Sequence, residues 1–462
     1  MKTADGAIRC RWERAARSLW LRVLLAAAAT AALGVLVEMF RYRCAVQDTR
    51  ALLVVPFLLL YVLGCALLLR GRFRSIPLTS YCAALMLLAL ALLLRYALLD
   101  IPSFDYKASL SNWLAAFAEA PGLSGLGVAI GDYNVPYRYL LLLIAKVMPA
   151  ETWLYGIKLL SLAFELILAY YVAAILQRRS GRYAVFCAGF FATLFLPTVF
   201  SNGAVFAQCD AIYAAFGVGA LYYGLLGKSR HCYLMMALAF SFKLQTVFLM
   251  PMLLVLLFCR RIRLRDCWVF PAAFLALLVP TVAAGRNALD AFAVYFHQAQ
   301  SYPELTLAAP SVFSLFTLEK VDARIFGFAG VLFAGGVCLA LLLYLYRIRE
   351  KLTDDRLLDA AFLFALLIPL LLPHMHERYF FCADVLACVY LFVHPRRWPV
   401  PFAVGLVSFL CCYTEAPYNG YPVSLGVMGI ALLAVAAYAV YRFYADVSAT
   451  GAASLPSAED EA

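Results

Sequence analysis

Charged side chains are scarce in this sequence. Only 14% of its 462 residues are Asp, Glu, Lys or Arg, whereas 65% are hydrophobic. Soluble domains carry roughly 25% charged and about 45–50% apolar residues. The scarcity of charge excludes a soluble enzyme, a disordered protein and a secreted disulfide scaffold. It leaves a helical membrane protein that crosses the bilayer several times.

The sequence also lacks a Cys-x-x-Cys pair and an excess of acidic residues. Its 14 cysteines lie mostly inside apolar runs, which indicates small core residues rather than a disulfide or zinc framework. The 38 basic residues outnumber the 27 acidic ones, but they form short clusters between the apolar runs. Such clusters set topology and contact anionic headgroups. Membrane lipids are therefore expected partners, and nucleic acid is not.

Apolar runs near 20 residues long, enough to cross a bilayer as helices, dominate the chain. They fall at 20–40, 51–69, 76–99, 152–176, 183–200, 209–226, 231–258, 267–284, 325–345, 357–372, 377–393, 399–414 and 422–443. We predict an all-α polytopic membrane protein, with about 13–14 transmembrane helices in a domain spanning 1–446. A disordered tail is predicted at 447–462.

Basic clusters separate these runs, and simple alternation puts nearly all of the clusters on one face, taken as cytoplasmic. They are the N-terminus, Arg70 to Arg74, Arg178 to Arg182, Lys228 to His231, Arg260 to Arg265, Arg347 to Lys351 and Arg396 to Arg397. The run 231–258 must then be a hairpin of two short halves, because one crossing would put Arg260 to Arg265 outside. The run 136–148 is too short to span.

Loops on the opposite face contain the acidic, amide, histidine and aromatic clusters of the chain. These loops are Ile101 to Pro136, Ser201 to Asp210, Gly285 to Pro310, Pro373 to Arg378 and Thr414 to Tyr421. This segregation predicts a site on the extracytoplasmic side of a multi-pass protein of the cell membrane.

The first outer loop, 101–136, is long enough to be functional and to carry short interfacial helices. Asp105 directly follows the third apolar run, where a carboxylate could act as a general base toward a sugar hydroxyl. The alternative is a merely solvated loop acid. Further candidates for sugar, acceptor or phosphate contacts in and just after this loop are Tyr106, Trp113, Asp132, Tyr133, Asn134 and Arg138.

Two more polar clusters interrupt the apolar runs. Asn202, Gln208 and Asp210 are candidate sugar or acceptor contacts, or else a polar cap on a helix end. Lys243 and Gln245 lie at the centre of the run 231–258. The Lys243 ammonium needs an anion, either Asp210 or a lipid phosphate, and Gln245 is a candidate sugar or acceptor contact. The alternative for Lys243 is a side chain that extends to an interface.

The densest cluster is Leu372-Pro373-His374-Met375-His376-Glu377-Arg378-Tyr379. Two histidines at i and i+2 share no helix face, and no second ligand pair is evident, so a metal site is disfavoured. Phosphate recognition by Arg378 and His376 is preferred, with Glu377 holding one of them; structural ion pairing is the alternative. His374 and Glu377 are also candidate sugar or acceptor contacts. Candidates for an acceptor pocket or gate, without a specific spacing, are His297, Gln298, Gln300, Glu304, Glu415, Tyr418 and Asn419.

Taken in order, the segments DY at Asp105, GDYNVP, NG with FAQCD, FKLQ and LLPHMHERY resemble the GT-C superfamily of integral-membrane glycosyltransferases. The similarity is greatest to bacterial proteins related to GPI mannosyltransferases and to glucosyltransferases of lipid-linked oligosaccharide assembly. Two features depart from the family. Ala207 stands where the usual GQxD has glycine, and two spans precede the helix of the catalytic loop, where many members have one.

The resemblance implies an inverting transferase that moves a hexose, most often mannose in this family, from a polyprenyl-phosphate carrier to a lipid or glycan acceptor. It implies Asp105 as the base, the cations Lys243, His376 and Arg378 near the donor phosphate, and Gln208 and Asp210 near the sugar or acceptor. No cofactor besides the polyprenyl-phosphate sugar is expected. Because polyprenyl phosphate is a good leaving group, one base and phosphate-binding cations would suffice.

Two other functions stay open. A transporter or flippase of lipid-linked glycans typically shows internal repeats and charges at the bilayer midplane; we find no repeat, and only Lys243 has that depth. A polymerase or ligase that moves a whole glycan from a diphosphate carrier would share the transferase chemistry.

Overall fold

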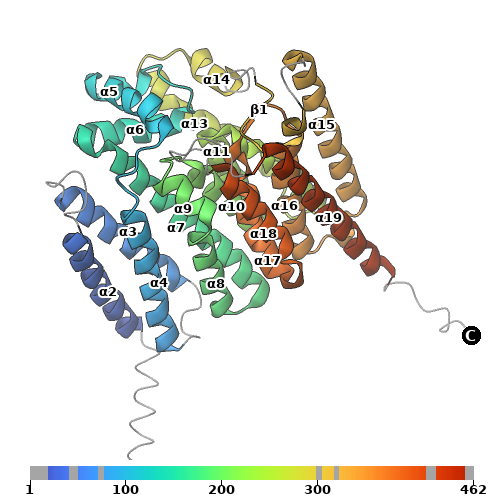
Figure 1. The fold of residues 1–462 in the computed structure, drawn as a ribbon, viewed down its shortest axis with the longest axis horizontal. Coiled ribbons are helices and arrows are strands. Elements are labelled where there is room, and N and C mark those ends of the chain that lie inside the picture. The colour runs from blue at the N-terminus through green and yellow to red at the C-terminus, as the bar shows by residue number, and fades with distance from the viewer. Residues whose placement is uncertain are drawn as a thin grey trace, which may run out of the picture. The chain divides into compact units, whose positions relative to one another are not determined.

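A computed structural model describes residues 19–40, 50–70, 77–297, 304–316, 322–412 and 423–452. Apart from two short strands, the regular elements of these residues are helices (Figure 1). The predicted all-α architecture is therefore confirmed. The chain divides into two compact units, Met1–Gly131 with Tyr137–Ala215, and Asp132–Pro136 with Phe216–Ala462.

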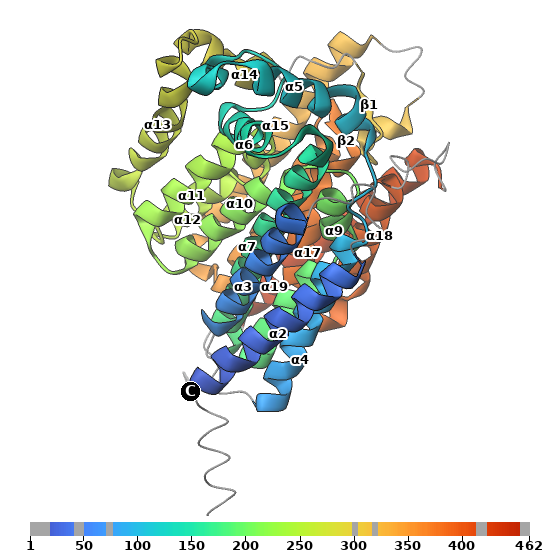
Figure 2. The same ribbon diagram turned by 90° about the vertical axis from the view of Figure 1, so that its left-hand side faces the viewer.

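The first unit is built around α7, a 28-residue helix that contacts α3 and α8. Its elements are α2 (Leu19–Phe40), α3 (Arg50–Arg70), α4 (Leu78–Tyr96), α5 (Ser111–Glu119), α6 (Val135–Val147), α7 (Trp153–Ser180), α8 (Tyr183–Leu194), α9 (Pro197–Ala204) and the start of α10 (Asp210–Leu225). Helices α2, α3 and α4 contact one another and lie side by side in Figure 2. The first outer loop carries short helices of its own, as predicted.

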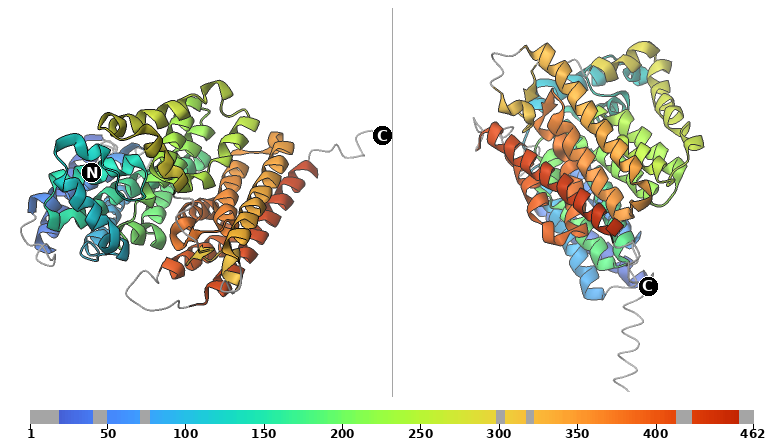
Figure 3. Two further views of the ribbon diagram at one scale, coloured as in Figure 1. Left: turned by 90° about the horizontal axis from the view of Figure 1, so that it is seen from above. Right: turned by 90° about the vertical axis from the view of Figure 1, so that its right-hand side faces the viewer.

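The second unit contains the rest of α10 and all later elements. They are α11 (Ser229–Phe242), α12 (Pro251–Phe258), α13 (Val269–Ala283), α14 (Ala288–His297), β1 (Thr306–Leu307), α15 (Ala323–Arg347), α16 (Asp354–Leu371), β2 (Met375–His376), α17 (Phe381–Val393), α18 (Pro399–Cys412) and α19 (Leu425–Ala452). Helices α16 to α19, orange to red in Figure 3, contact one another in a ring.

Local sequence signals explain where several helices begin and end. Gly181, at φ 69°, follows the last residue of α7, in the left-handed conformation that commonly ends helices. Pro197 and Pro251 stand in the first turn of α9 and α12, where no N–H is needed. The side chain of Thr353 accepts a hydrogen bond from the Arg356 N–H and caps α16.

Six described helices are long and apolar enough to cross a membrane, or seven if the bent pair α8 and α9 is one span. The other predicted runs also coincide with helices, but these are shorter or more polar, such as α10, α17 and α18. A polytopic membrane protein is thus supported. The number of described helices that are long and apolar enough to span is smaller than the predicted 13–14. The helix α19 ends six residues beyond 446, so the predicted tail starts too early; 453–462 lie outside the described residues.

The predicted hairpin at 231–258 is confirmed. Helix α11 ends before Lys243, which has extended backbone at φ −153°, and α12 begins at Pro251 after a 3-10 turn. Ser229 at the start of α11 exchanges hydrogen bonds with the backbone of Arg263, just after α12. The two halves therefore return to the same end.

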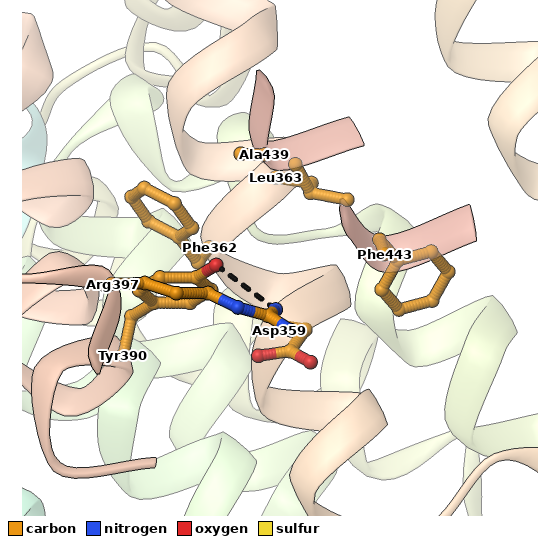
Figure 4. A pocket seen from close by; sticks show the side chains of 7 residues that line it. All are labelled: Asp359, Phe362, Leu363, Tyr390, Arg397, Ala439 and Phe443. Atoms are coloured by element: carbon orange, nitrogen blue, oxygen red, sulfur yellow. Dashed lines mark hydrogen bonds between the residues drawn. The ribbon is translucent and has the colours of Figure 1, made fainter. Parts of the chain in front are cut away.

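Basic clusters of the second unit gather at that same end. Beyond the Ser229 contact, Arg261 pairs with Asp354 at 2.5 Å. Asp446 accepts hydrogen bonds from both Arg356 and Arg397, at 2.9 and 2.7 Å. Figure 4 shows Arg397 against Tyr390 in the narrow pocket between α16, α17 and α19. Four predicted clusters of this unit thus share one end, as the charge pattern predicted.

Candidate functional site

Asp105 lies in the first turn of a helical segment that follows α4 after a short connection. The Oγ of Ser103 accepts a hydrogen bond from the Tyr106 N–H at 3.1 Å and so caps the segment. A π-helical turn, Tyr106–Leu110, follows immediately and leads into α5. Because π turns occur frequently at functional sites, this local geometry agrees with a functional role for the segment.

The structure joins Asp105 to a second predicted motif. Gln208 Nε2 donates a hydrogen bond to Asp105 Oδ2 at 2.5 Å. Gln208 itself is 2% exposed, and its backbone carbonyl accepts a hydrogen bond from Ser161 of α7 at 2.6 Å. The half-buried Asp105 carboxylate is therefore oriented by the Gln208 side-chain amide, and the Gln208 backbone is itself held by Ser161.

Asn202 and Asp210 form a second pair in the first unit. Asn202 Nδ2 donates to Asp210 Oδ2 at 2.8 Å, and the Asp210 side chain is fully buried in the first turn of α10. This carboxylate points toward α9 rather than to solvent. The sequence allows this pair to be either a sugar or acceptor contact or a polar cap on a helix end. The geometry favours the structural contact at the helix end.

Sequence reasoning missed a buried ion pair behind these motifs. Arg95 Nε bonds Glu165 Oε2 at 2.6 Å, and both side chains are at most 2% exposed. A Cβ at Gly203 would lie 2.2 Å from Glu165 Oε1. The Asn202-Gly203 dipeptide therefore has glycine because α9 approaches this carboxylate closely.

Backbone strain is concentrated in the predicted site segments. Four described non-glycine residues have positive φ, and three of these are Ala207 at 54°, Ala308 at 62° and His374 at 60°. Ala207 occupies the position where the resembled motif has glycine. Strained residues of this kind cluster at functional sites.

Substitution of Ala207 tests that strain. Ala207→Gly removes a left-handed penalty of about 1–2 kcal/mol and one buried methyl worth about 0.8 kcal/mol, so stability should change little. Ala207→Val, which adds a β-branched side chain at a fully buried position, should destabilise by about 1–3 kcal/mol. Thermal unfolding in detergent measures both. Equal stability of the two variants would show that this φ is not constrained.

Trp113 and Arg138 make contacts that shape the loop. A Cβ at Gly131 would lie 2.6 Å from Trp113 Cε2, so the indole packs on the Gly131 backbone. Arg138 Nη2 donates to the Gly131 carbonyl at 2.8 Å and is 5% exposed. Both side chains hold the end of the first loop in this structure.

In the second unit, Lys243 lies beside the end of that loop. Its ammonium is 5.9 Å from the centroid of the Tyr133 ring, a cation–π distance. Asn134 is fully buried and donates to the Phe240 carbonyl at 3.3 Å, one turn before Lys243. Gln245 lies in the 3-10 turn that follows, and Asp132 is exposed.

The histidine cluster is held by a loop that sequence reasoning treated as weak. Strands β1 and β2 pair in parallel, with Leu307 opposite His376. The His374 N–H donates to the Leu305 carbonyl at 2.9 Å, and its Nδ1 lies 2.7 Å from the Glu304 carbonyl. Glu304 thus contributes through its backbone.

Glu377 bridges the two predicted phosphate contacts. Its Oε1 accepts from Arg378 Nη1 at 2.9 Å, and its Oε2 lies 3.6 Å from His376 Nδ1. Burial alone would raise the pKa of Glu377, but the adjacent Arg378 guanidinium and the nearby His376 side chain lower the pKa to about 2. Glu377 is therefore a carboxylate at neutral pH and neutralises part of the cluster.

The structure brings the predicted residues together within each unit. Ring contacts of Tyr379 with His376 and Phe248, at 5.2 and 6.3 Å, link the histidine cluster to the turn after Lys243. Gln298, Gln300, Glu415, Tyr418, Asn419 and the side chain of His297 lie outside the described residues.

Comparison of the chain with protein-family models, curated proteins and solved structures found no match.

Proposed function

We propose that the protein is an inverting glycosyltransferase of the GT-C type. It moves a hexose from a polyprenyl-phosphate carrier to a lipid or glycan acceptor on the extracytoplasmic face of the cell membrane. The observation that carries the proposal is the hydrogen bond from Gln208 to Asp105, two residues 103 positions apart that belong to separate motifs of the resembled family.

Asp105 supplies the base in this proposal. Its carboxylate takes the proton of the acceptor hydroxyl as the acceptor oxygen attacks the anomeric carbon. The bond from that carbon to the phosphate oxygen breaks, and polyprenyl phosphate leaves with the electron pair. The half-buried position of Asp105 and its orientation by Gln208 support this role.

Lys243 and Arg378, which the resemblance implies near the donor phosphate, belong to the second unit. Lys243 is 7% exposed and Arg378 is only partly exposed, so both charges are held in place rather than freely solvated. Because Glu377 pairs with Arg378, its carboxylate offsets the guanidinium charge of that residue. Lys243 and Arg378 together supply the positive charge for a donor phosphate in this proposal.

The test is an assay of the purified chain in nanodiscs with a panel of polyprenyl-phosphate hexoses and membrane lipid extracts. Transfer of the sugar with release of free polyprenyl phosphate is expected. No release from any donor, together with flux of a lipid-linked glycan in liposomes, would overturn the proposal in favour of a flippase. Turnover of diphosphate-linked glycans alone would indicate a polymerase or ligase.

A further inference from the structure

A polar stripe runs along the otherwise apolar helix α7. Tyr155, Lys158, Ser161 and Glu165 follow one another at intervals of three, three and four residues. At 100° per residue they fall within an arc of about 120° and span about 15 Å of helix. Each side chain is at most 3% exposed. Polar groups buried at this depth are expensive unless they are paired, so each is expected to hold a specific partner.

Lys158 holds the chain directly before Asp105. Its Nζ donates to the carbonyls of Leu98, Leu99 and Ile101, at 2.8, 2.9 and 2.6 Å. An ammonium has three donors, so these bonds use all of them. The acceptors lie just after the end of α4, where helical carbonyls lose their partners and a positive charge is favourable.

The first turn of α7 adds two contacts to the same stretch. The Tyr155 hydroxyl donates to Asp100 Oδ1 at 2.5 Å. The Tyr106 hydroxyl lies near the Leu154 backbone; burial raises the pKa of Tyr106 and this backbone contact partly offsets the rise. The stretch from Leu98 to Tyr106, which contains Asp105, is therefore anchored on both sides of that carboxylate.

The stripe also fixes the partner of Asp105. Ser161, one turn beyond Lys158, donates to the Gln208 carbonyl at 2.6 Å, while the Gln208 side chain donates to Asp105. Both members of the Asp105–Gln208 hydrogen bond are thus attached to one helix. A helix is a more precise support for a reacting group than a loop.

We infer that Lys158 is a positioning residue for Asp105, which it holds through the backbone of residues 98–101. The inference rests on the proposed function for its kinetic consequence, but the structural consequence stands by itself. Loss of the Lys158 bonds should misplace the carboxylate without touching the donor. Misplacements of about 1 Å can lower rates about 10²-fold.

The experiment compares Lys158→Met with Lys146→Met in the full-length chain. Lys146 makes the same kind of bond, to the carbonyls of Ala118 and Ala120, but it is exposed, lies on α6 and contacts a different part of the loop. Lys158→Met should raise hydrogen exchange of amides 98–106 and lower kcat about 10²-fold with the donor KM unchanged. Lys146→Met should do neither. In an Asp105→Asn background, Lys158→Met should add little further loss, which a general loss of stability would not reproduce.

Unchanged exchange at 98–106 in Lys158→Met would overturn the inference whether or not the chain is a transferase. Raised exchange with full activity, when Asp105→Asn is inactive, would also overturn it. Absence of transfer by the unsubstituted chain would instead defeat the proposed function, and exchange would still test the anchor. If Lys158→Met fails to fold, Tyr155→Phe removes only the bond to Asp100 and should raise exchange at 100–106; no change there would contradict the anchor.

Discussion

Replacing Asp105 by asparagine is expected to lower the rate of sugar transfer by about 10²–10⁴-fold, the contribution typical of a general base. The asparagine carbonyl can accept the bond that Gln208 now donates to Asp105. The segment should therefore keep its conformation while losing the group that takes the proton. The initial rate at saturating polyprenyl-phosphate sugar measures the effect, and an unchanged melting temperature shows that the fold is intact.

Glu119→Gln is the matched control for Asp105→Asn. Glu119 is an exposed carboxylate at the end of α5, in the same outer loop, and it belongs to neither predicted motif. Its neutralisation should leave the rate unchanged. Full activity of Asp105→Asn would remove this carboxylate from the mechanism, and equal losses in both variants would indicate a general effect of loop charge.

Replacing Glu165 by leucine is expected to lower the free energy of unfolding by about 3–5 kcal/mol, because it leaves a buried charge without its counter-ion. Arg95 is 2% exposed and bonds Glu165 at 2.6 Å, with further bonds to the carbonyls of Leu194 and Ala91. The guanidinium would stay buried in an apolar bundle with backbone partners alone. Equilibrium unfolding in mixed micelles measures the loss.

The double variant Arg95→Met with Glu165→Leu separates the charge from the packing. Buried ion pairs can often be replaced by apolar residues of similar volume at little cost. The double variant should therefore recover most of the stability lost by Glu165→Leu. If it is as unstable as the single variant, the effect of Glu165 lies in its shape beside Gly203 and not in its charge.

The helices of the second unit, and the gathering of its basic clusters at one end, could be predicted from the sequence, because apolar length and clustered basic residues are local signals. The hairpin at 231–258 followed from charge alone, since Arg260 to Arg265 had to return to the other basic clusters. The contact of Ser229 with Arg263 is the consequence. Lys243 marks the break, where α11 gives way to extended backbone.

The polar stripe of α7 has a signal in the sequence, although the partners of its side chains do not. Lys158, Ser161 and Glu165 recur at helical spacing in an apolar run, which is the signal of a buried polar face. The partners of these side chains could not be predicted. Every residue has a backbone carbonyl, so the sequence does not indicate that the carbonyl of Leu98 in particular accepts a hydrogen bond from Lys158.

The candidate site was predicted by segment rather than by contact. Asp105 with Gln208 and Tyr133 with Lys243 come from predicted clusters, but their pairing depends on the packing of distant elements. The parallel pairing of Thr306 and Leu307 with β2 gave no sequence signal, since each strand has two residues. Arg138 shows the converse, a cation predicted for phosphate that binds the Gly131 carbonyl.

The central claim is that the Asp105 segment and the histidine cluster face the extracytoplasmic side, away from the basic clusters. Single cysteines at the exposed positions Lys107, Glu304, Arg179 and Arg396, in a background that gives no labelling, test it with an impermeant maleimide on intact cells. We expect labelling at 107 and 304 from outside, and at 179 and 396 only after permeabilisation. Labelling of 107 and 304 from opposite sides of the membrane would contradict the account.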